Sequence, residues 1–233
     1  MKKIICIVLA AVLVMALAAG IYLIPHKCVD ETALESTDTV TVSDDGNTCF
    51  LDGEGEEALL IFYPGGKVEY TAYCALLKEI AERGVDCCVV RVPLNLAVLD
   101  VKKAKSIIED SPYEKIYVGG HSFGGVAAAM YASDHYDELA GIVFLASYPN
   151  NDISDLPLRV LSVKGDRDGL VTAGKMEKAE PLMPEECEYL VIEGGNHAQF
   201  GTYGEQSGDN PALISAESQR QQAADVIADF ILK

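Results

Sequence analysis

Residues 115–129, KIYVGGHSFGGVAAA, decide how the rest of the chain is interpreted. They begin with β-branched and aromatic residues typical of a strand and end in small residues compatible with a helix. Between them, residues 120–124 read G-x-S-x-G, a pattern typical of a serine exposed at a sharp turn between a strand and a helix. The glycines leave room for neighbouring backbone, and the following helix N-terminus favours negative charge on the serine oxygen. Because this pattern is common by chance, its meaning depends on the surrounding chain.

Outward from this stretch, apolar runs alternate with amphipathic helices. Continuous apolar runs such as ALLIFY at 58–63 predict strands that are buried on both faces. Residues 39–42 and 48–51 flank a turn and predict a hairpin at an antiparallel edge. The sequence therefore predicts one α/β domain, a mostly parallel β-sheet flanked by helices on both faces. Further strands are expected at 87–92, from Lys115 up to the serine turn, at 140–146, 158–163 and 189–192, and helices at 70–82, 100–109, after Ser122, 172–179 and 215–231.

The N-terminus carries a long apolar segment, IICIVLAAVLVMALAAGIYLI at 4–24, after Lys2 and Lys3. As a helix it would be about 30 Å long, enough to span a bilayer. We expect an uncleaved membrane anchor with a cytoplasmic N-terminus and the remaining chain outside the cytoplasm. A cleaved signal that releases a secreted protein is the alternative, for which residues 16–18 (ALA) offer a cleavage site, and a buried soluble helix is a third. We expect two parts. Residues 1–30 form the anchor or signal and the start of a tether, and residues 31–233 form the α/β domain.

Charge and cysteine content exclude two classes of function. The chain has 18 basic and 36 acidic residues. Removing residues 1–30 takes away three lysines and one aspartate, which leaves 15 basic and 35 acidic residues and a net charge of −20. Such a surface repels nucleic acid and anionic lipid headgroups. The seven cysteines form no C-x-x-C spacing, so we expect buried free thiols rather than a metal or redox site.

A nucleophilic serine needs a base, and one of the four histidines has a suitable position. His26 lies in the polar, aperiodic segment at 25–37, which we expect to be a tether. His121 is the variable residue of the serine pattern, and His135 lies at the far end of the following helix. His197 lies in EGGNHA, a glycine-rich loop after the last expected strand. A loop at the carboxyl end of a parallel sheet can present an imidazole to a site there. His197 is therefore the candidate base.

Two aspartates that follow the strand at 158–163 compete to orient this base. Asp168 is favoured because apolar Leu170 and Val171 lie just beyond it and anchor the turn. Asp166 lies nearer the strand, where it is suited to capping the turn. The chosen carboxylate would accept a hydrogen bond from Nδ1–H of the histidine and stabilise the imidazolium.

The chain order Ser122, Asp168, His197, each after a strand, resembles the α/β-hydrolase fold over residues 58–232. The chain is similar to compact carboxylesterase-like or dienelactone-hydrolase-like serine hydrolases without a large cap. The resemblance implies an oxyanion hole made by the backbone amide of Phe123 and one amide from the loop at 64–67. Gly66 and Lys67 are both candidates for this second donor.

The spacing of the later strands bears on the shape of the site. Only about a dozen residues, 147–157, separate two strands where the family's cap normally enters, which leaves no room for a helical lid. We expect a shallow, open site unless the polar loop at 198–213 folds over it. The apolar stretch at 93–99 is either another wall of the site or ordinary core packing.

The resemblance implies a serine hydrolase that cleaves a carboxylic ester of small to medium acyl group through an acyl-enzyme. It implies a small-molecule substrate and no metal or organic cofactor. A thioesterase, amidase or acyltransferase using the same triad is the alternative among enzymes. From another class, the domain would be a non-catalytic binding module on a hydrolase scaffold.

Overall fold

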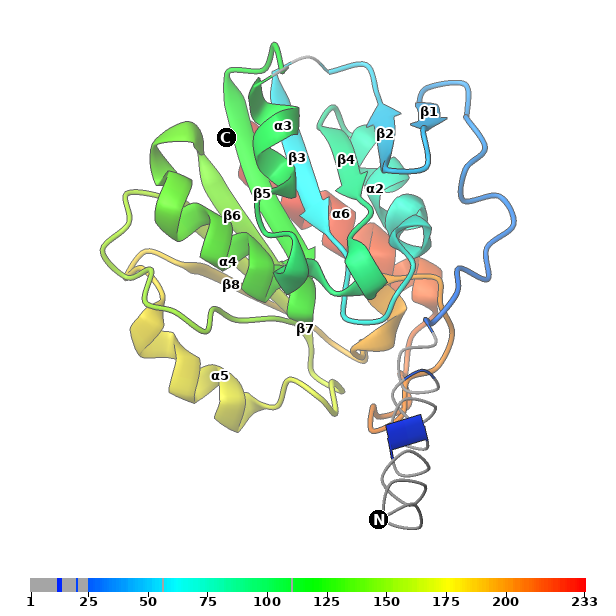
Figure 1. Ribbon diagram of the computed structural model, residues 1–233. Helices are drawn as coiled ribbons and strands as arrows, with labels where there is room; N and C mark the ends of the chain where they lie inside the picture. Colours follow the sequence, from blue (N-terminus) through cyan, green and yellow to red (C-terminus); the bar gives the residue numbers. More distant parts are fainter. Residues whose placement is uncertain (1–11, 14–19, 21–24, 56, 110) are drawn as a thin grey trace, which may run out of the picture.

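The computed structural model describes residues 12–13, 20, 25–55, 57–109 and 111–233 (Figure 1). The apolar helix expected over residues 4–24 lies outside the described residues except at three positions. No helix within the described ranges is long and apolar enough to cross a membrane.

One eight-stranded sheet organises the described chain, in the order β1-β2-β4-β3-β5-β6-β7-β8. Strands β3 to β8 are parallel to one another, whereas β1 and β2 form the expected antiparallel hairpin beside β4. The mostly parallel sheet predicted from the sequence is thereby confirmed. The strands are β1 (Thr41–Asp44), β2 (Thr48–Asp52), β3 (Ala58–Tyr63), β4 (Asp86–Val90), β5 (Lys115–His121), β6 (Gly141–Leu145), β7 (Arg159–Gly165) and β8 (Glu188–Ile192).

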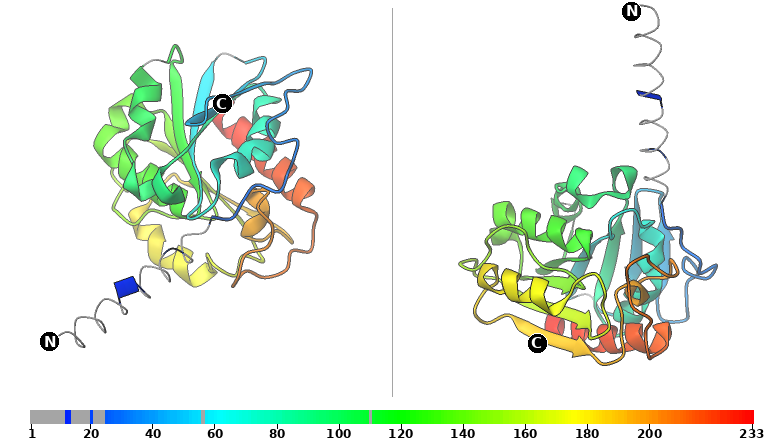
Figure 2. Two further views of the ribbon diagram at one scale, coloured as in Figure 1. Left: turned by 45° about the vertical axis from the view of Figure 1, so that its right-hand side comes forward. Right: turned by 90° about the horizontal axis from the view of Figure 1, so that it is seen from below.

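Helices cover both faces of the sheet (Figure 2). Helices α2 and α6 bury their apolar sides in one core, and α3 and α4 bury theirs in a second core on the other face. In α6 the buried Ala223, Ile227 and Phe230 recur every three or four residues, the spacing of one helical face. The helices are α2 (Cys74–Ala81), α3 (Lys103–Glu109), α4 (Phe123–His135), α5 (Ala173–Ala179) and α6 (Ala216–Leu232), with 3₁₀ turns η1 (Tyr70–Tyr73), η2 (Pro93–Asn95), η3 (Ala97–Leu99), η4 (Tyr136–Glu138), η5 (Glu180–Leu182) and η6 (Ala198–Phe200).

Two of the predicted helices differ from expectation at their starts. The helix expected from residue 70 begins as the 3₁₀ turn η1 and becomes α-helical only at Cys74. The helix expected from residue 100 begins at Lys103, after the separate turn η3.

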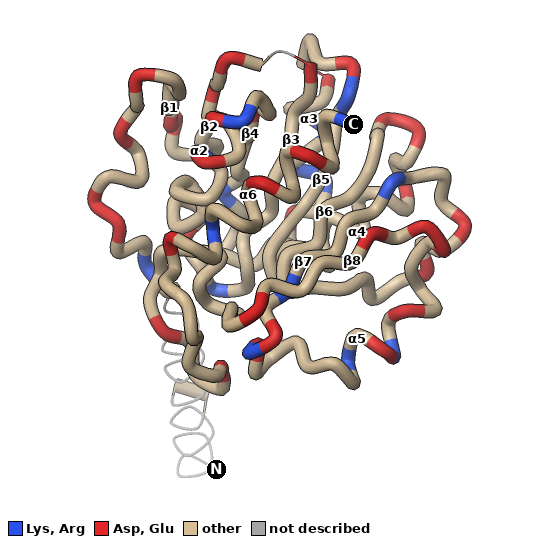
Figure 3. The backbone as a smooth tube through the Cα atoms, turned by 180° about the vertical axis from the view of Figure 1, so that it is seen from behind, with Lys and Arg blue, Asp and Glu red and all other residues tan. Residues whose placement is uncertain are grey.

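Side-chain distribution agrees with the expectations from composition. The six cysteines in the described ranges are free thiols, four of them buried and two partly exposed. In the view of Figure 3 acidic residues are spread over many loops and helices, and in the whole sequence they outnumber the basic ones.

The loops that follow β3 and β5 meet at one place on the sheet. The chain leaves β3 towards β4 on one side and leaves β5 towards β6 on the other, so the two loops diverge from adjacent strands. Tyr63 and Gly120, near the ends of these strands, are paired in register. Parallel α/β sheets bind ligands at such a switch point, beyond the ends of the strands. We call this side of the sheet, where β3 to β8 end, the carboxyl edge.

Candidate active site

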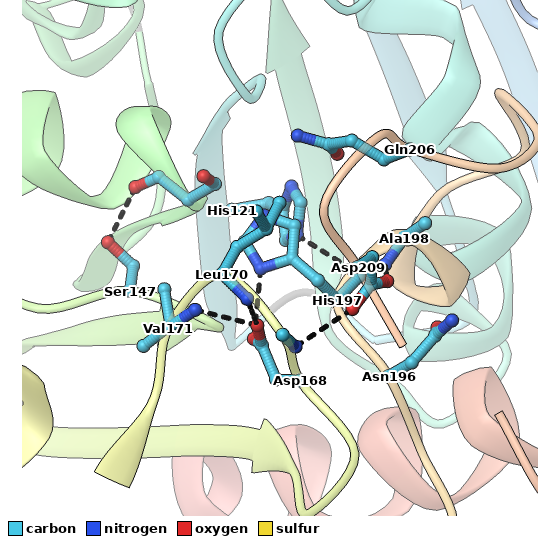
Figure 4. A network of polar contacts seen from close by, with 12 residues as sticks. His121, Ser147, Asp168, Leu170, Val171, Asn196, His197, Ala198, Gln206 and Asp209 are labelled. Atoms are coloured by element: carbon cyan, nitrogen blue, oxygen red, sulfur yellow. Dashed lines mark hydrogen bonds and ion pairs between the residues drawn. The ribbon is translucent and has the colours of Figure 1, made fainter. Parts of the chain in front are cut away.

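Ser122 lies at the carboxyl edge, on the turn between β5 and α4. Its backbone has φ 52° and ψ −119°, a conformation that costs a residue with a Cβ about 1–3 kcal/mol. The turn is sterically possible because residue 120 is a glycine: a Cβ there would lie only 2.3 Å from the Gly124 carbonyl carbon. Two bonds hold it. Ser122 N donates to Leu145 O at 2.9 Å. Ser147 Oγ donates to Ser122 O at 2.6 Å, the bond drawn at Ser147 in Figure 4. The serine side chain is left partly exposed.

Asp168 and His197 form a buried pair beside this turn. His197 Nδ1 lies 2.9 Å from Asp168 Oδ2, and both side chains are almost fully excluded from solvent. The other carboxylate oxygen, Oδ1, accepts from the amides of Leu170 at 2.8 Å and Val171 at 2.7 Å. Burial raises the pKa of Asp168, but the bonds from His197 and the two amides outweigh it, so the pKa lies below its usual value. The carboxylate is therefore ionised at neutral pH.

His197 Nε2 is the unengaged end of this pair. It is buried and has no hydrogen-bond partner in the described part of the chain. The competing acid, Asp166, instead accepts from Gly194 N at 2.7 Å and so ties the end of β7 to the loop after β8. The geometry thus brings Asp168, and not Asp166, to His197.

The loop that carries His197 is fixed by two residues that sequence reasoning missed. Gln219, fully buried in α6, accepts from Asn196 N at 2.9 Å and donates to Asn196 O at 2.7 Å. Asp209 accepts from Ala198 N at 2.9 Å through one oxygen and from Gly169 N at 3.0 Å through the other. The loop at 198–213 therefore joins the base loop to the acid turn. The signal in the sequence is a polar residue on the otherwise apolar inner face of an amphipathic helix, as Gln219 is in α6.

His121, expected only as the variable residue of the serine pattern, is a central element of the site. Its Nε2 lies 3.0 Å from His197 O, and its Nδ1 lies 2.9 Å from Tyr73 Oη. Since a carbonyl can only accept, Nε2 is assigned the proton, and Tyr73 Oη then donates to Nδ1. Tyr73 Oη in turn accepts from Gly65 N at 3.0 Å. This chain of bonds, here called the His121 network, links the loop after β3, the serine turn and the base loop.

The bond directions assigned to the His121 network are those of a neutral imidazole, and the surroundings favour that form. Burial, followed by the neighbouring His197, lowers the pKa of His121 well below its usual value, although its bond to the His197 carbonyl acts in the opposite direction. The ring lies 4.5 Å from the His197 ring, centroid to centroid.

The loop at 64–67 presents one unengaged amide. Lys67, which adopts φ 63°, donates its N–H to Asn95 O at 2.7 Å. Within the described ranges the Gly66 amide donates no hydrogen bond, and a Cβ at Gly66 would lie 3.4 Å from Phe123 Cβ. Phe123 begins α4, where backbone amides have no partner within the helix. Of the two candidates in this loop, the Gly66 amide is the one free to bind an oxyanion beside Phe123.

Two segments near the site bear on its shape. Residues 146–158, between β6 and β7, contain no helix. The 93–99 stretch forms the turns η2 and η3, and its exposed Leu94 lies next to Asn95, the partner of Lys67. This stretch therefore contributes to the rim of the site.

Comparison with known proteins agrees with this geometry. A family model described as "Alpha/beta hydrolase family" matches residues 59–221, which is more than half of the chain. No curated protein matches the sequence. The fold is similar to that of several solved structures, all at low sequence identity. TT1662 from Thermus thermophilus has a TM-score of 0.60 at 16% identity and covers 83% of this chain and 99% of its own. Est1E from Butyrivibrio proteoclasticus has a TM-score of 0.56 at 15% identity, and the match covers 84% of this chain and 100% of Est1E. The monoacylglycerol lipase of Paleococcus ferrophilus has a TM-score of 0.61 at 12% identity, and the match covers 78% of this chain and 98% of the lipase. The chain belongs to the alpha/beta hydrolase family of enzymes.

Proposed function

We propose that this enzyme is a serine hydrolase that cleaves a carboxylic ester of small to medium acyl group through Ser122, His197 and Asp168. One observation carries the proposal. A buried imidazole is bonded through Nδ1 to an ionised carboxylate and has an unengaged Nε2, at the edge where a strained turn exposes a serine. A serine becomes a nucleophile near neutral pH when such a base takes its proton.

The reaction follows from these groups in two halves. Ser122 Oγ attacks the ester carbonyl carbon while His197 Nε2 takes its proton, and Asp168 stabilises the imidazolium. The amides of Phe123 and Gly66 bind the oxyanion, each contributing about 2.7–4 kcal/mol. His197 then gives its proton to the leaving alcohol, which leaves the acyl group on Ser122. In the second half His197 deprotonates water, the hydroxide attacks the acyl carbon, and Ser122 departs with a proton from His197 as the carboxylic acid is released.

The limit on acyl size rests on the open rim. No helix lies between β6 and β7 in the described chain, and the exposed rim residues Leu94 and Phe123 offer apolar surface to an acyl chain. A series of nitrophenyl esters of increasing acyl length measures this, and we expect kcat/KM to peak at short or medium chains. A strong preference for long chains would contradict the open site.

The decisive test is covalent labelling of the full chain. The detergent-solubilised protein is treated with a fluorophosphonate probe, the adduct is mapped, and Ser122→Ala serves as the control. We expect the label on Ser122; folded protein that stays unlabelled would favour a binding module and overturn the proposal. Matched ester, thioester and anilide substrates with one acyl group then separate an esterase from a thioesterase or amidase. An added alcohol acceptor detects acyl transfer.

For location, the proposal follows the uncharged run at 4–24: a membrane anchor with the hydrolase domain outside the cytoplasm. Fractionation of the full-length protein tests this. We expect an intact chain in the membrane fraction, whereas a soluble and shortened chain would indicate a cleaved signal.

A further inference from the structure

Residues 26–29, which the sequence suggested were part of a tether, are bonded to the domain; we call them the N-terminal strap. His26 forms a parallel bridge with Val68, through His26 N to Lys67 O at 2.6 Å and Glu69 N to His26 O at 3.0 Å. Cys28 N donates to Glu69 Oε2 at 3.1 Å. Val29 N donates to Thr202 O at 2.7 Å. The strap is therefore held at both ends.

The strap is attached to the oxyanion loop itself. Lys67 follows Gly66, and both of its backbone groups are engaged: the carbonyl by His26 and the amide by Asn95. The other end of the strap reaches Thr202, just after η6 and on the same loop as His197. The chain therefore enters the domain at the carboxyl edge, between the loops that surround the site.

Because the chain enters here, the connection between the apolar segment and the domain is very short. The apolar segment ends at Ile24, two residues before His26. Two residues span at most about 7 Å. The headgroup layer of a bilayer is about 5–8 Å thick on each side of the hydrocarbon core. With residues 4–24 in a membrane, His26 and the loop that it holds lie at headgroup depth.

Exposed apolar side chains occur at the same edge. Val29 of the strap is 68% exposed, Leu94 beside Asn95 is 60% exposed, and Phe123 beside Gly66 is 47% exposed. The strongly acidic domain is repelled by anionic headgroups, so an uncharged lipid surface suits this edge best. Apolar side chains of this size are stabilised when they leave water for the lipid boundary.

From these observations, and resting on the proposed ester chemistry and anchor, we propose that the carboxyl edge faces a neutral bilayer. The enzyme then takes its ester from that bilayer. The strap acts as a rigid spacer that holds the oxyanion loop at the membrane surface. The substrate class is an amphiphilic ester whose apolar part stays in the lipid while its short or medium acyl ester reaches Ser122.

The test compares two probes that share one scissile bond. One is the hexanoyl ester of umbelliferone, and the other is the same ester with a hexadecyl tail on the umbelliferone. The full chain is reconstituted in phosphatidylcholine vesicles, and the ratio of the tailed to the untailed rate is measured. A variant with a flexible 30-residue Gly-Ser insertion between Pro25 and His26 keeps the strap but adds an r.m.s. reach of about 30 Å. We expect this insertion to lower the ratio about tenfold and to leave the untailed rate within twofold.

A charge at the lipid-facing edge gives a second, independent readout. Val29→Asp should lower the ratio severalfold, and the matched control Leu232→Asp, at the exposed end of α6, should leave it unchanged. An unchanged ratio in both the insertion variant and Val29→Asp would overturn the inference while the untailed rate still supports the proposed function. Recovery of a shortened, soluble chain would also overturn it. If the unaltered chain is neither labelled at Ser122 nor able to hydrolyse either probe, the proposed function is overturned instead.

Discussion

The His121 network predicts that one hydroxyl far from the serine in sequence controls the rate of the reaction. The substitution Tyr73→Phe removes only Oη. The ring keeps its packing against Phe62, at 5.2 Å between centroids. What is lost is the hydroxyl between Gly65 N and His121 Nδ1, at 3.0 and 2.9 Å.

The size of the effect can be worked from these two bonds. A buried polar group left without a partner costs about 1–3 kcal/mol, so the two groups left by this substitution should lower the free energy of unfolding by about 2–6 kcal/mol. The rate effect arises because Gly65 precedes Gly66. If the altered loop loses half of the contribution of one oxyanion donor, the barrier rises by about 1.4–2 kcal/mol. That corresponds to a fall in kcat of about 10- to 30-fold.

Steady-state kinetics on an untailed ester, with a trifluoromethyl ketone inhibitor, measure this. The ketone forms a tetrahedral adduct on the serine, so its Ki reports oxyanion binding, whereas KM reports the ground state. For Tyr73→Phe we expect Ki to rise in proportion to the fall in kcat/KM, with KM nearly constant. Tyr131→Phe is the matched control: Tyr131 is also a buried residue, and its Oη donates to Glu138 Oε2 at 2.9 Å, outside the His121 network.

The outcome that refutes this reasoning is specific. Both variants would lose stability, but Tyr73→Phe would keep kcat and Ki within twofold of the unaltered enzyme. The hydroxyl would then contribute to packing alone, and the His121 network would have no part in positioning the oxyanion loop.

Three further predictions follow from the acid, from His121 and from Glu79. Asp168→Asn should lower kcat by about 10⁴-fold because the histidine loses its orienting acceptor, whereas Asp166→Asn should cost only a few-fold; equal losses would contradict the assignment. The folded-state pKa of His121 lies below its unfolded value of 6.5, so below that pH the unfolded chain binds an extra proton and stability falls as pH falls. Urea unfolding of His121→Asn between pH 6.5 and 5 should lack up to about 1.4 kcal/mol per pH unit of this slope, and an unchanged slope would refute a neutral His121. Burial raises the pKa of Glu79 to about 7 despite Arg220, so between its unfolded value of 4.5 and about 7 stability falls as pH rises. Glu79→Gln should therefore raise Tm relative to the unaltered chain more at pH 8 than at pH 5; a gain independent of pH would exclude this carboxyl as the cause.

The sheet and its helices could be predicted because buried positions in them are occupied by apolar residues in a regular pattern. The run ALLIFY forms β3 with all six residues buried, and the hairpin at the antiparallel edge follows from its turn. The geometry also favours Asp168 over Asp166, in line with the sequence: Leu170 and Val171 donate their amides to the Asp168 carboxylate, so the turn is built around it.

What the sequence could not show are interactions made by the backbone or between distant segments. The strap pairs with the oxyanion loop through main-chain groups, which leave no pattern of side chains in residues 25–37. The choice between Gly66 and Lys67 depends on which amide Asn95 already occupies. Tyr73, His121 and His197 are 48 and 76 residues apart, and their contact depends on how three loops meet at one edge.

The neutrality of His121 is a requirement of the proposed mechanism as well as a consequence of burial. His197 becomes positive when it takes the serine proton, and the His121 ring lies 4.5 Å away. Two unit charges at that distance repel by about 4 kcal/mol at an effective dielectric constant of 20. A charged His121 would therefore raise the barrier to serine attack by an amount equal to the gain from one oxyanion donor. Since His121 Nε2 already donates to the His197 carbonyl, protonation would have to occur at Nδ1, which accepts from Tyr73. The tyrosine hydroxyl thus protects the base from a second charge, and it does so with the bond that also holds the oxyanion loop.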